Sequence, residues 1–209
     1  MIDMKDLKKN NYIYFASSNK NKLEEIKSIL QSYKSKRLNK LKIKSAPEGF
    51  YVKEDGKTFL ENAFKKASFL SKKLNKVVFA EDSGMEVFAL GGKPGIKSAR
   101  FFKGGKGMLE IIKKLSNKKN RKCCFTAAIV VTNEKGKTIF KTQRSCHGTI
   151  THKPIGNNGF GYDPIFLIPT LNKTSAQISQ KLKNKLSHRA LVTKDFAKWL
   201  IKTNYKLFP

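Results

Sequence analysis

The sequence predicts an α/β fold with a mixed central β-sheet. Its first part alternates short β-prone runs with amphipathic helical segments, over residues 12–80. Its later part contains a long apolar run, residues 123–132, which a turn connects to a second β-prone run. A hydrophobic content of 39% in 209 residues is enough for a buried core.

The elements of the first part follow from residue spacing. Residues 12–17 and 41–45 are predicted strands, the second at a sheet edge, and residues 77–80 form a buried strand. A helix is expected after Asn19, because apolar residues recur at helical spacing from Leu23 to Tyr33. Residues 59–74 are predicted to form a second helix, whose buried face comprises Leu60, Ala63, Phe64, Ala67 and Leu74.

The later elements follow from the same criteria. The sequence Glu81-Asp82-Ser83-Gly84 is predicted to be a turn, and a further strand is expected over residues 85–90. The remaining expected elements are a short helix (108–115), a hairpin (123–132 and 138–148), a glycine-rich loop (157–164) and a closing helix (187–205). We expect one domain over residues 12–209, preceded by a polar extension over residues 1–11.

The formal net charge of +29 is extreme. Such a charge is typical of nucleic-acid-binding proteins, and the alternative is compositional drift in a lysine-rich proteome. Arginine, which specific phosphate and base recognition favours, supplies only 5 of the 44 basic residues. Lysines are spread along the whole chain. We therefore favour drift over a specific nucleic-acid surface, although the charge would still attract polyphosphate substrates.

The cysteines and the apolar runs indicate a cytoplasmic protein. Cys123, Cys124 and Cys146 form no Cys-x-x-Cys pair, and neighbouring strand residues point to opposite faces. Reduced thiols are therefore expected. The apolar runs are too short to cross a membrane, and the first residues lack the apolar region of a signal peptide.

The segment from Ser17 to Lys22 is a candidate phosphate-binding loop. It lies between a predicted strand and a predicted helix, where free backbone N–H groups and the helix dipole attract anions. Small hydroxyl residues allow a phosphate to approach closely, and a lysine adds positive charge. The alternative interpretation is an ordinary capped helix.

Two adjacent acids form a second candidate site. Glu81 and Asp82 follow the apolar run VVFA in a chain with only 15 acidic residues. In α/β folds the end of a strand is where functional groups gather. Carboxylates there can bind Mg²⁺ together with substrate phosphates, or deprotonate a water. A solvated turn is the alternative, and we favour a functional site.

Three more segments have both a functional and a structural interpretation. Glu54 is a third acid, in a loop. The aromatic residues of the segment 160–163 could stack on a base or pack within a turn. His188 and Arg189 could donate hydrogen bonds to a purine carbonyl, or belong to a helix start with surface charge.

Taken together, these segments resemble those of the inosine/xanthosine triphosphate pyrophosphatases. The resemblance runs from about Phe15 to Ala190 and rests on FASSNKNKLEEI, EDGKTFLENAFKKA, FAEDSGMEVFALGGKPGIKSARF, GFGYDPIF and LSHRA. It implies an elongated, two-lobed α/β fold with a long mixed sheet flanked by helices and an active-site cleft between the lobes. It also implies a Mg²⁺-dependent homodimer that hydrolyses ITP, dITP and XTP to the monophosphate and pyrophosphate, which cleans the nucleotide pool.

The resemblance also implies roles for individual residues. Asp82 matches the catalytic carboxylate, which accepts a proton and binds the metal. Glu54 matches a metal ligand, and Glu81 stands beside Asp82 where aspartate is usual, as a further metal contact. The residues that match substrate contacts are Ser17, Ser18, Asn19, Lys20, Asn21, Lys22, Ser83, Phe160, Gly161, Tyr162, Asp163, Lys183, His188 and Arg189.

Two alternatives remain at this point. One is a related nucleotide pyrophosphatase with another base preference. The other, from a different class, is a basic nucleic-acid-binding protein, which gives no reason for the acidic pair to exist. The segment between Phe102 and Met108 is shorter than is usual in the family. The helix that follows it, and part of the expected dimer surface, should therefore differ from those of other members.

Overall fold

The computed structural model describes residues 12–203, and both the predicted extension over residues 1–11 and Tyr205 lie outside this range. A seven-stranded sheet has the order β2-β1-β3-β4-β5-β6-β7. β1 (Tyr12–Phe15) pairs in parallel with β2 (Lys42–Ser45) and β3 (Val78–Val87). β6 (Phe166–Ile168) pairs antiparallel with β5 (Thr138–Ile150) and with β7 (Lys173–Thr174). The predicted α/β class and mixed sheet are therefore confirmed.

The chain divides into two compact units. The first comprises the residues up to Glu81, Ala128–Thr142 and the residues from Val192 onward. The second comprises Asp82–Ala127 and Gln143–Leu191. Each of the three longest strands, β3, β4 (Lys122–Thr132) and β5, contributes residues to both units.

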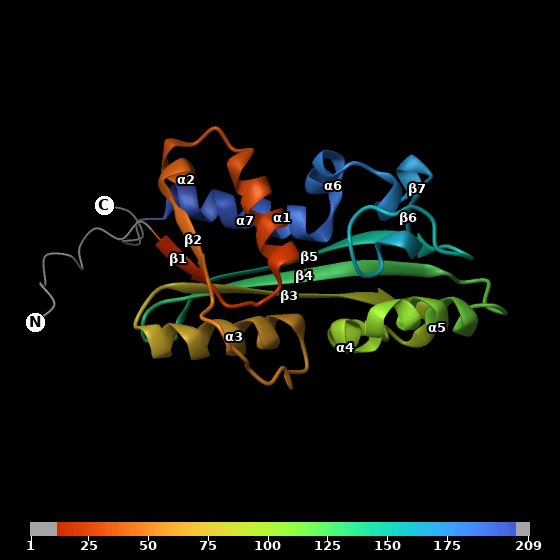
Figure 1. Ribbon diagram of the computed structural model, residues 1–209, viewed down its shortest axis with the longest axis horizontal. Coiled ribbons are helices and arrows are strands. Elements are labelled where there is room, and N and C mark those ends of the chain that lie inside the picture. The colour runs from red at the N-terminus through yellow and green to blue at the C-terminus, as the bar shows by residue number, and fades with distance from the viewer. Residues whose placement is uncertain (1–11, 204–209) are drawn as a thin grey trace, which may run out of the picture. The chain divides into compact units, whose positions relative to one another are not determined.

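Helices cover both faces of the strands in the first unit. α3 (Phe59–Leu74) lies on one face, whereas α1 (Lys20–Gln31) and the part of α7 (His188–Lys202) that belongs to this unit lie on the other (Figure 1). Thr58 caps α3 by accepting a hydrogen bond from the N–H of Glu61, 3.1 Å away. Asn75, in the left-handed conformation at φ 51°, ends the helix. The predicted bounds of this helix are confirmed.

The two faces of β3 carry different side chains because strand residues alternate. Val78 and Ala80 pack against the alanines of α3, whose small side chains let the helix approach the sheet. Phe79 faces the opposite side, where its ring lies 4.8 Å from that of Phe15 and 4.9 Å from that of Phe196. The prediction that Phe64 is buried is wrong, since 41% of it is exposed on the outer face of α3.

The predicted turn at residues 81–84 is also wrong. Glu81, Asp82, Ser83 and Gly84 lie inside β3, which continues to Val87 without a break. The separate strand expected over residues 85–90 does not exist, because its first residues complete β3 and Phe88–Leu90 form a 3₁₀ helix. Consecutive residues of β3 are buried here, so the carboxylates of both Glu81 and Asp82 are enclosed by the protein.

The β4–β5 hairpin is as predicted. Its turn closes through Asn133, whose N–H donates to the carbonyl of Lys137 at 2.9 Å. The Asn133 side chain accepts hydrogen bonds from the N–H groups of Lys135 and Lys137, at 3.1 and 2.9 Å. Among the described residues, the α-helices and strands that the sequence did not predict are short: α2 (Lys36–Lys40), α4 (Ser98–Phe102), α6 (Gln180–Leu186), β6 and β7.

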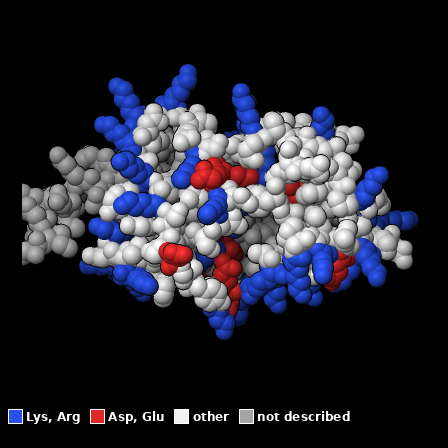
Figure 2. Space-filling view, in the orientation of Figure 1, with Lys and Arg blue, Asp and Glu red and all other residues white. Residues whose placement is uncertain are grey.

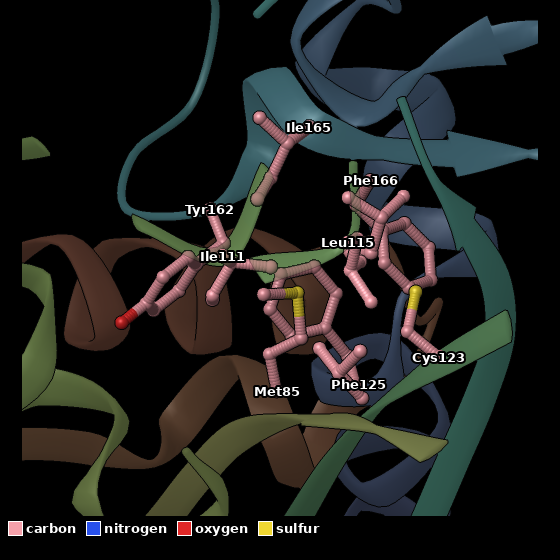
Figure 3. Close-up of a cluster of buried hydrophobic side chains, with 10 residues drawn as sticks. Met85, Ile111, Leu115, Cys123, Phe125, Tyr162, Ile165 and Phe166 are labelled. Carbon is pink, nitrogen blue, oxygen red and sulfur yellow. The ribbon is translucent and has the colours of Figure 1, made fainter. Parts of the chain in front are cut away.

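The second unit has its own hydrophobic core (Figure 3). α4 (Ser98–Phe102) and α5 (Lys106–Lys114) cover it, and Ile111 of α5 packs against Met85 of β3. Arg121 connects the end of α5 to the end of β5. Its guanidinium donates hydrogen bonds to the carbonyls of Leu115, Ile150 and Thr151, each 2.8 Å away. None of the helices between residues 12 and 203 has the length and hydropathy of a membrane-spanning segment.

The packing of Phe79 predicts a large effect of truncation. Phe79→Ala should lower the free energy of unfolding by about 3–5 kcal/mol, because the lost ring leaves a cavity between Phe15 and Phe196. Phe69→Ala is the matched control: its ring is 50% exposed, and its truncation should cost about 0.5 kcal/mol or less. Urea denaturation of both variants measures the difference. Equal losses would contradict this description of the first core.

Candidate active site

The predicted phosphate-binding loop forms an open helix start in the first unit. Asn19 caps α1: its side chain accepts a hydrogen bond from the N–H of Lys22 at 3.1 Å. Its own N–H donates to the hydroxyl of Ser17 at 3.2 Å. Ser18, Asn19, Lys20 and Asn21 are exposed to solvent. The loop backbone is thus fixed by its own side chains, while the positive end of a twelve-residue helix is accessible to an anion.

Lys22 points from this helix start to Glu81. Its ammonium lies 2.7 Å from Oε2 of Glu81, and the Glu81 side chain has no exposed surface. The Lys22 side chain keeps 16% of its surface exposed, so a ligand can reach it. An ion pair of this kind is expected where a carboxylate is buried in a sheet, because an isolated charge there would be very costly.

Glu54 lies in the loop before α3 and is paired with Lys66. The ammonium of Lys66 lies 2.6 Å from Oε1 of Glu54 and also donates to the carbonyl of Glu81 at 3.1 Å. The loop is held against α3 because Asn62 accepts a hydrogen bond from the N–H of Gly56 at 2.8 Å. Any side chain at position 56 would collide with Asn62, so glycine is needed for this close approach.

Sequence reasoning missed Lys66. A lysine on the buried face of a helix gives no signal in a chain where most basic residues are lysine. The only available hint was its position, because Lys66 falls among the apolar residues Ala63, Ala67 and Leu70 that cover the sheet. A charge at such a position needs a buried partner.

Asp82 and Ser83 begin the second unit. Asp82 is buried, with 5% of its surface exposed, in the interior of β3. The hydroxyl of Ser83 accepts a hydrogen bond from the guanidinium of Arg189, 3.1 Å away. The predicted base-recognition residue Arg189 is therefore attached to the residue that follows the predicted catalytic carboxylate.

The predicted base-binding loop is organised by Asp163. Its Oδ2 accepts a hydrogen bond from the N–H of Phe160 at 2.8 Å and lies 2.6 Å from the ammonium of Lys183. Both members of this ion pair are almost completely buried. A side chain at Gly159 would collide with the same carboxylate, and Gly159 has a φ of 76°. The loop conformation is therefore specified by a buried charge and a glycine.

Phe160 carries the aromatic surface of this loop. The Lys183 ammonium lies 4.9 Å from the centre of its ring, and the Arg189 guanidinium lies 5.5 Å from it. Cations at these distances interact favourably with the ring and hold it in place. A ring restrained in this way is suited to stacking on a planar base.

Tyr162 has a structural role that its position in the loop did not reveal. Its ring belongs to the second core, and its hydroxyl points away from the other labelled side chains (Figure 3). That hydroxyl donates to the carbonyl of Ser98 at 2.9 Å, and burial raises the pKa of Tyr162, so the proton stays in place. The Tyr162 hydroxyl is therefore engaged in holding the loop to the second core.

A cavity of about 160 Å³ adjoins these residues within the second unit. Among the residues that line it are Phe125, Cys146, Phe166, Asp163, Lys183 and His188. The imidazole of His188 stacks on Phe125 with a centroid distance of 4.7 Å, which fixes the plane of the ring. A hollow with apolar walls and a few oriented polar groups is typical of a small-molecule site.

The fold and these sites define an α/β protein with an exposed helix start in one unit and a charged, aromatic pocket in the other. The sequence identifies the family. Residues 13–199 match the Ham1 family, and the chain belongs to it. The resemblance inferred from the motifs is confirmed.

Relatives of known name and structure agree. The dITP/XTP pyrophosphatase of Staphylococcus epidermidis is 44% identical over 183 residues, which cover 85% of this chain and 90% of the relative. The dITP/XTP pyrophosphatase of Shouchella clausii is 40% identical over 186 residues, which cover 86% of this chain and 91% of the relative.

Solved structures of the family share the fold. The Ham1 protein of Staphylococcus aureus aligns with a TM-score of 0.79 and 36% identity, over 90% of this chain and 97% of its own. The HAM1 protein of Coxiella burnetii aligns with a TM-score of 0.79 and 29% identity, over 92% and 99% of the two chains.

The buried ion pair makes Lys183 important for stability. Lys183→Met should lower the free energy of unfolding by about 3 kcal/mol, because it leaves the buried Asp163 carboxylate without its cation. Lys185→Met, on the exposed side of the same helix, should change it by about 0.5 kcal/mol or less. Chemical denaturation measures both. Identical unfolding midpoints for the two variants would show that the pair does not hold the loop.

The cysteine next to the cavity should react slowly. Burial raises the pKa of the Cys146 thiol from 9.0 to about 11, so its thiolate fraction at pH 8 is about a hundredfold below that of an ordinary thiol. Iodoacetamide at pH 8, followed by peptide mass spectrometry, should show slow labelling of Cys146 that becomes fast in urea. Rapid labelling in the folded protein would contradict the raised pKa of this thiol.

Proposed function

We propose that this Ham1-family protein hydrolyses purine nucleoside triphosphates with non-standard bases, namely ITP, dITP and XTP, to the monophosphate and pyrophosphate. One observation carries the proposal. Glu81 is paired with Lys22 of the helix start, and Ser83 is bonded to Arg189 beside the aromatic loop. Asp82 is the residue between them in β3. The names of the two curated relatives above support the same activity.

Mg²⁺ is the proposed cofactor, with Glu54 and Asp82 as its protein ligands. Their carboxylate oxygens are the donors that this ion prefers, and 32% of the Glu54 side chain is exposed and accessible. No cluster of three or more His, Cys, Asp and Glu side chains suited to a metal is found within residues 12–203. This donor set fits Mg²⁺, which needs only one or two carboxylates when substrate phosphates complete its coordination. When bound, the ion would neutralise charge on the phosphates.

Asp82 is the proposed base. It would accept a proton from a water whose oxygen forms a bond to the α-phosphorus. The bond between the α-phosphorus and the bridging oxygen breaks, and pyrophosphate leaves with that oxygen. Lys22 and the backbone N–H groups of the helix start would bind the negatively charged tail.

Lys183 is better suited to the base than to the phosphate tail. Its ammonium is held by Asp163 and lies over the ring of Phe160. We therefore place it with His188 and Arg189, both buried, as part of the base-recognition group. Hydrogen-bond donors there would favour a purine with a 6-keto oxygen. The 6-amino group of adenine presents another donor, which would leave buried groups unpaired, so ATP should be a poor substrate.

A homodimer in the cytoplasm is the proposed state of the protein. The three cysteines are free thiols, which fits a reducing compartment. The competing hypothesis of a nucleic-acid-binding protein is supported only by the high positive net charge.

Figure 2 shows Lys and Arg side chains scattered over the visible face, with the few Asp and Glu side chains in small groups. Such scatter fits the drift interpretation better than a dedicated binding surface.

A product assay tests the proposal. The protein with Mg²⁺ should release pyrophosphate and the monophosphate from ITP and XTP, and very little from ATP. Asp82→Asn should lower kcat by at least about a hundredfold while the fold is kept, because the amide cannot accept the proton. Glu110→Gln, an exposed acid on α5, is the matched control and should keep full activity. Orthophosphate as the product, or salt-sensitive DNA binding without turnover, would rule the proposal out.

A further inference from the structure

The ion pair between Lys22 and Glu81 differs from the pair that Glu24 and Lys27 form on the same helix. Glu24 and Lys27, 3.2 Å apart, are an exposed pair one turn apart on α1. Lys22 instead crosses from α1 to β3, where Glu81 is completely buried. An exposed pair contributes little, whereas a buried carboxylate with a close cation fixes the position of both groups.

The direction of the Lys22 side chain is not determined by its own helix. Asn19 and Ser17 fix the backbone of the loop, and the hydrogen bond that Asn19 accepts comes from the backbone N–H of Lys22 and not from its side chain. A lysine side chain is a flexible four-carbon stem that loses considerable rotamer entropy when it is ordered. Glu81 supplies that order before a ligand arrives, since the contact of 2.7 Å holds the ammonium at the open end of α1.

We propose that Glu81 is a positioning residue, which acts through Lys22 to prepare the binding site for the triphosphate tail. The inference rests on the proposed function and deepens it, because it separates the roles of the two adjacent acids. Asp82 would act as the base and a metal ligand, whereas Glu81 would hold the ammonium of Lys22 in position. This replaces the role of metal contact that the resemblance suggested for Glu81.

Burial and connectivity favour this role. The Glu81 side chain has no exposed surface, and it faces Lys22 rather than solvent. Its carbonyl is also fixed, because it accepts a hydrogen bond from Lys66 at 3.1 Å. Glu54, in contrast, keeps 32% of its side-chain surface exposed. A fully enclosed carboxylate that already contacts an ammonium is poorly suited to bind a hydrated Mg²⁺ ion.

In this role, the length of the Glu81 side chain determines whether its carboxylate reaches the Lys22 ammonium. Aspartate at this position would be one methylene shorter, and the contact with the Lys22 ammonium would lengthen. Arginine reaches further than lysine and carries two forked donors. Lys22→Arg should therefore restore part of the loss caused by Glu81→Asp, which is a rescue that a purely structural role of Glu81 does not predict.

A double-mutant cycle with a binding readout tests the proposal. Glu81→Gln should raise the KM for ITP about tenfold, with a much smaller change in kcat and an unchanged Mg²⁺ requirement. In the Lys22→Met background the same substitution should have no further effect on KM. Glu24→Gln is the matched control on α1 and should leave all these quantities unchanged.

Each other outcome overturns the inference. A lower KM in Glu81→Gln would mean that the carboxylate only masks the lysine charge. A raised Mg²⁺ requirement would make Glu81 a metal ligand. A loss that is additive with Lys22→Met, or falls mainly on kcat, would make it a structural residue.

A second measurement separates this inference from the proposed function. Binding of inorganic tripolyphosphate with Mg²⁺, followed by calorimetry, requires no nucleotide hydrolysis. Glu81→Gln should weaken it about tenfold in the wild-type background and leave it unchanged in Lys22→Met. If the wild-type protein fails to hydrolyse ITP, the proposed function is wrong, and this cycle still decides whether Glu81 positions Lys22. Equal affinities of wild type and Glu81→Gln would overturn the positioning role.

Discussion

The need to compensate buried charge is the constraint on which both units depend. β3 carries Glu81 and Asp82 inside a sheet, where a carboxylate without a partner would be strongly destabilising. In the first unit, Glu81 forms an ion pair with Lys22. In the loop before α3, Glu54 forms an ion pair with Lys66. Glu81 and Glu54 each fix the position of a lysine ammonium, and the proposed polyphosphate site would use such a fixed cation. In the proposed function, the same ion pair that compensates the buried charge of Glu81 also prepares Lys22 for the substrate.

The second unit uses the same principle for an aromatic surface. The buried pair of Asp163 and Lys183 determines the path of the loop, and Phe160 is held by that loop and by two cations. Tyr162 secures the loop to the core through Ser98. The proposed base-recognition group thus consists of side chains that are already held by contacts within the protein. Such preorganisation reduces the entropy that a ligand must overcome on binding.

Much of the fold could be predicted from the sequence, because the helices and the hairpin have strong periodicity and recognisable caps. Residues 59–74 are the clearest example, with Thr58 at one end and Asn75 at the other. The error at residues 81–84 has a physical cause: local rules read Asp, Ser and Gly as turn formers, whereas pairing with neighbouring strands kept the segment extended. The short elements α6 and β7 depend on tertiary contacts and give no local signal.

The candidate site was predictable only as a set of segments. The motifs named the residues, but not their partners, because the pairs of Lys22 with Glu81 and of Asp163 with Lys183 join positions far apart in the chain. Lys66 was marked only by its position among the apolar residues of α3. The family resemblance supplied the expected roles, and its active-site cleft and the homodimer remain predictions.

Isotope labelling tests the central claim most directly. If ITP is hydrolysed in water enriched in ¹⁸O, attack at the α-phosphorus places the label in the monophosphate, and mass spectrometry of the products should find it there alone. Label in pyrophosphate would show attack at the β-phosphorus. Label in orthophosphate would show removal of the terminal phosphate, and either result would contradict the account given for Asp82.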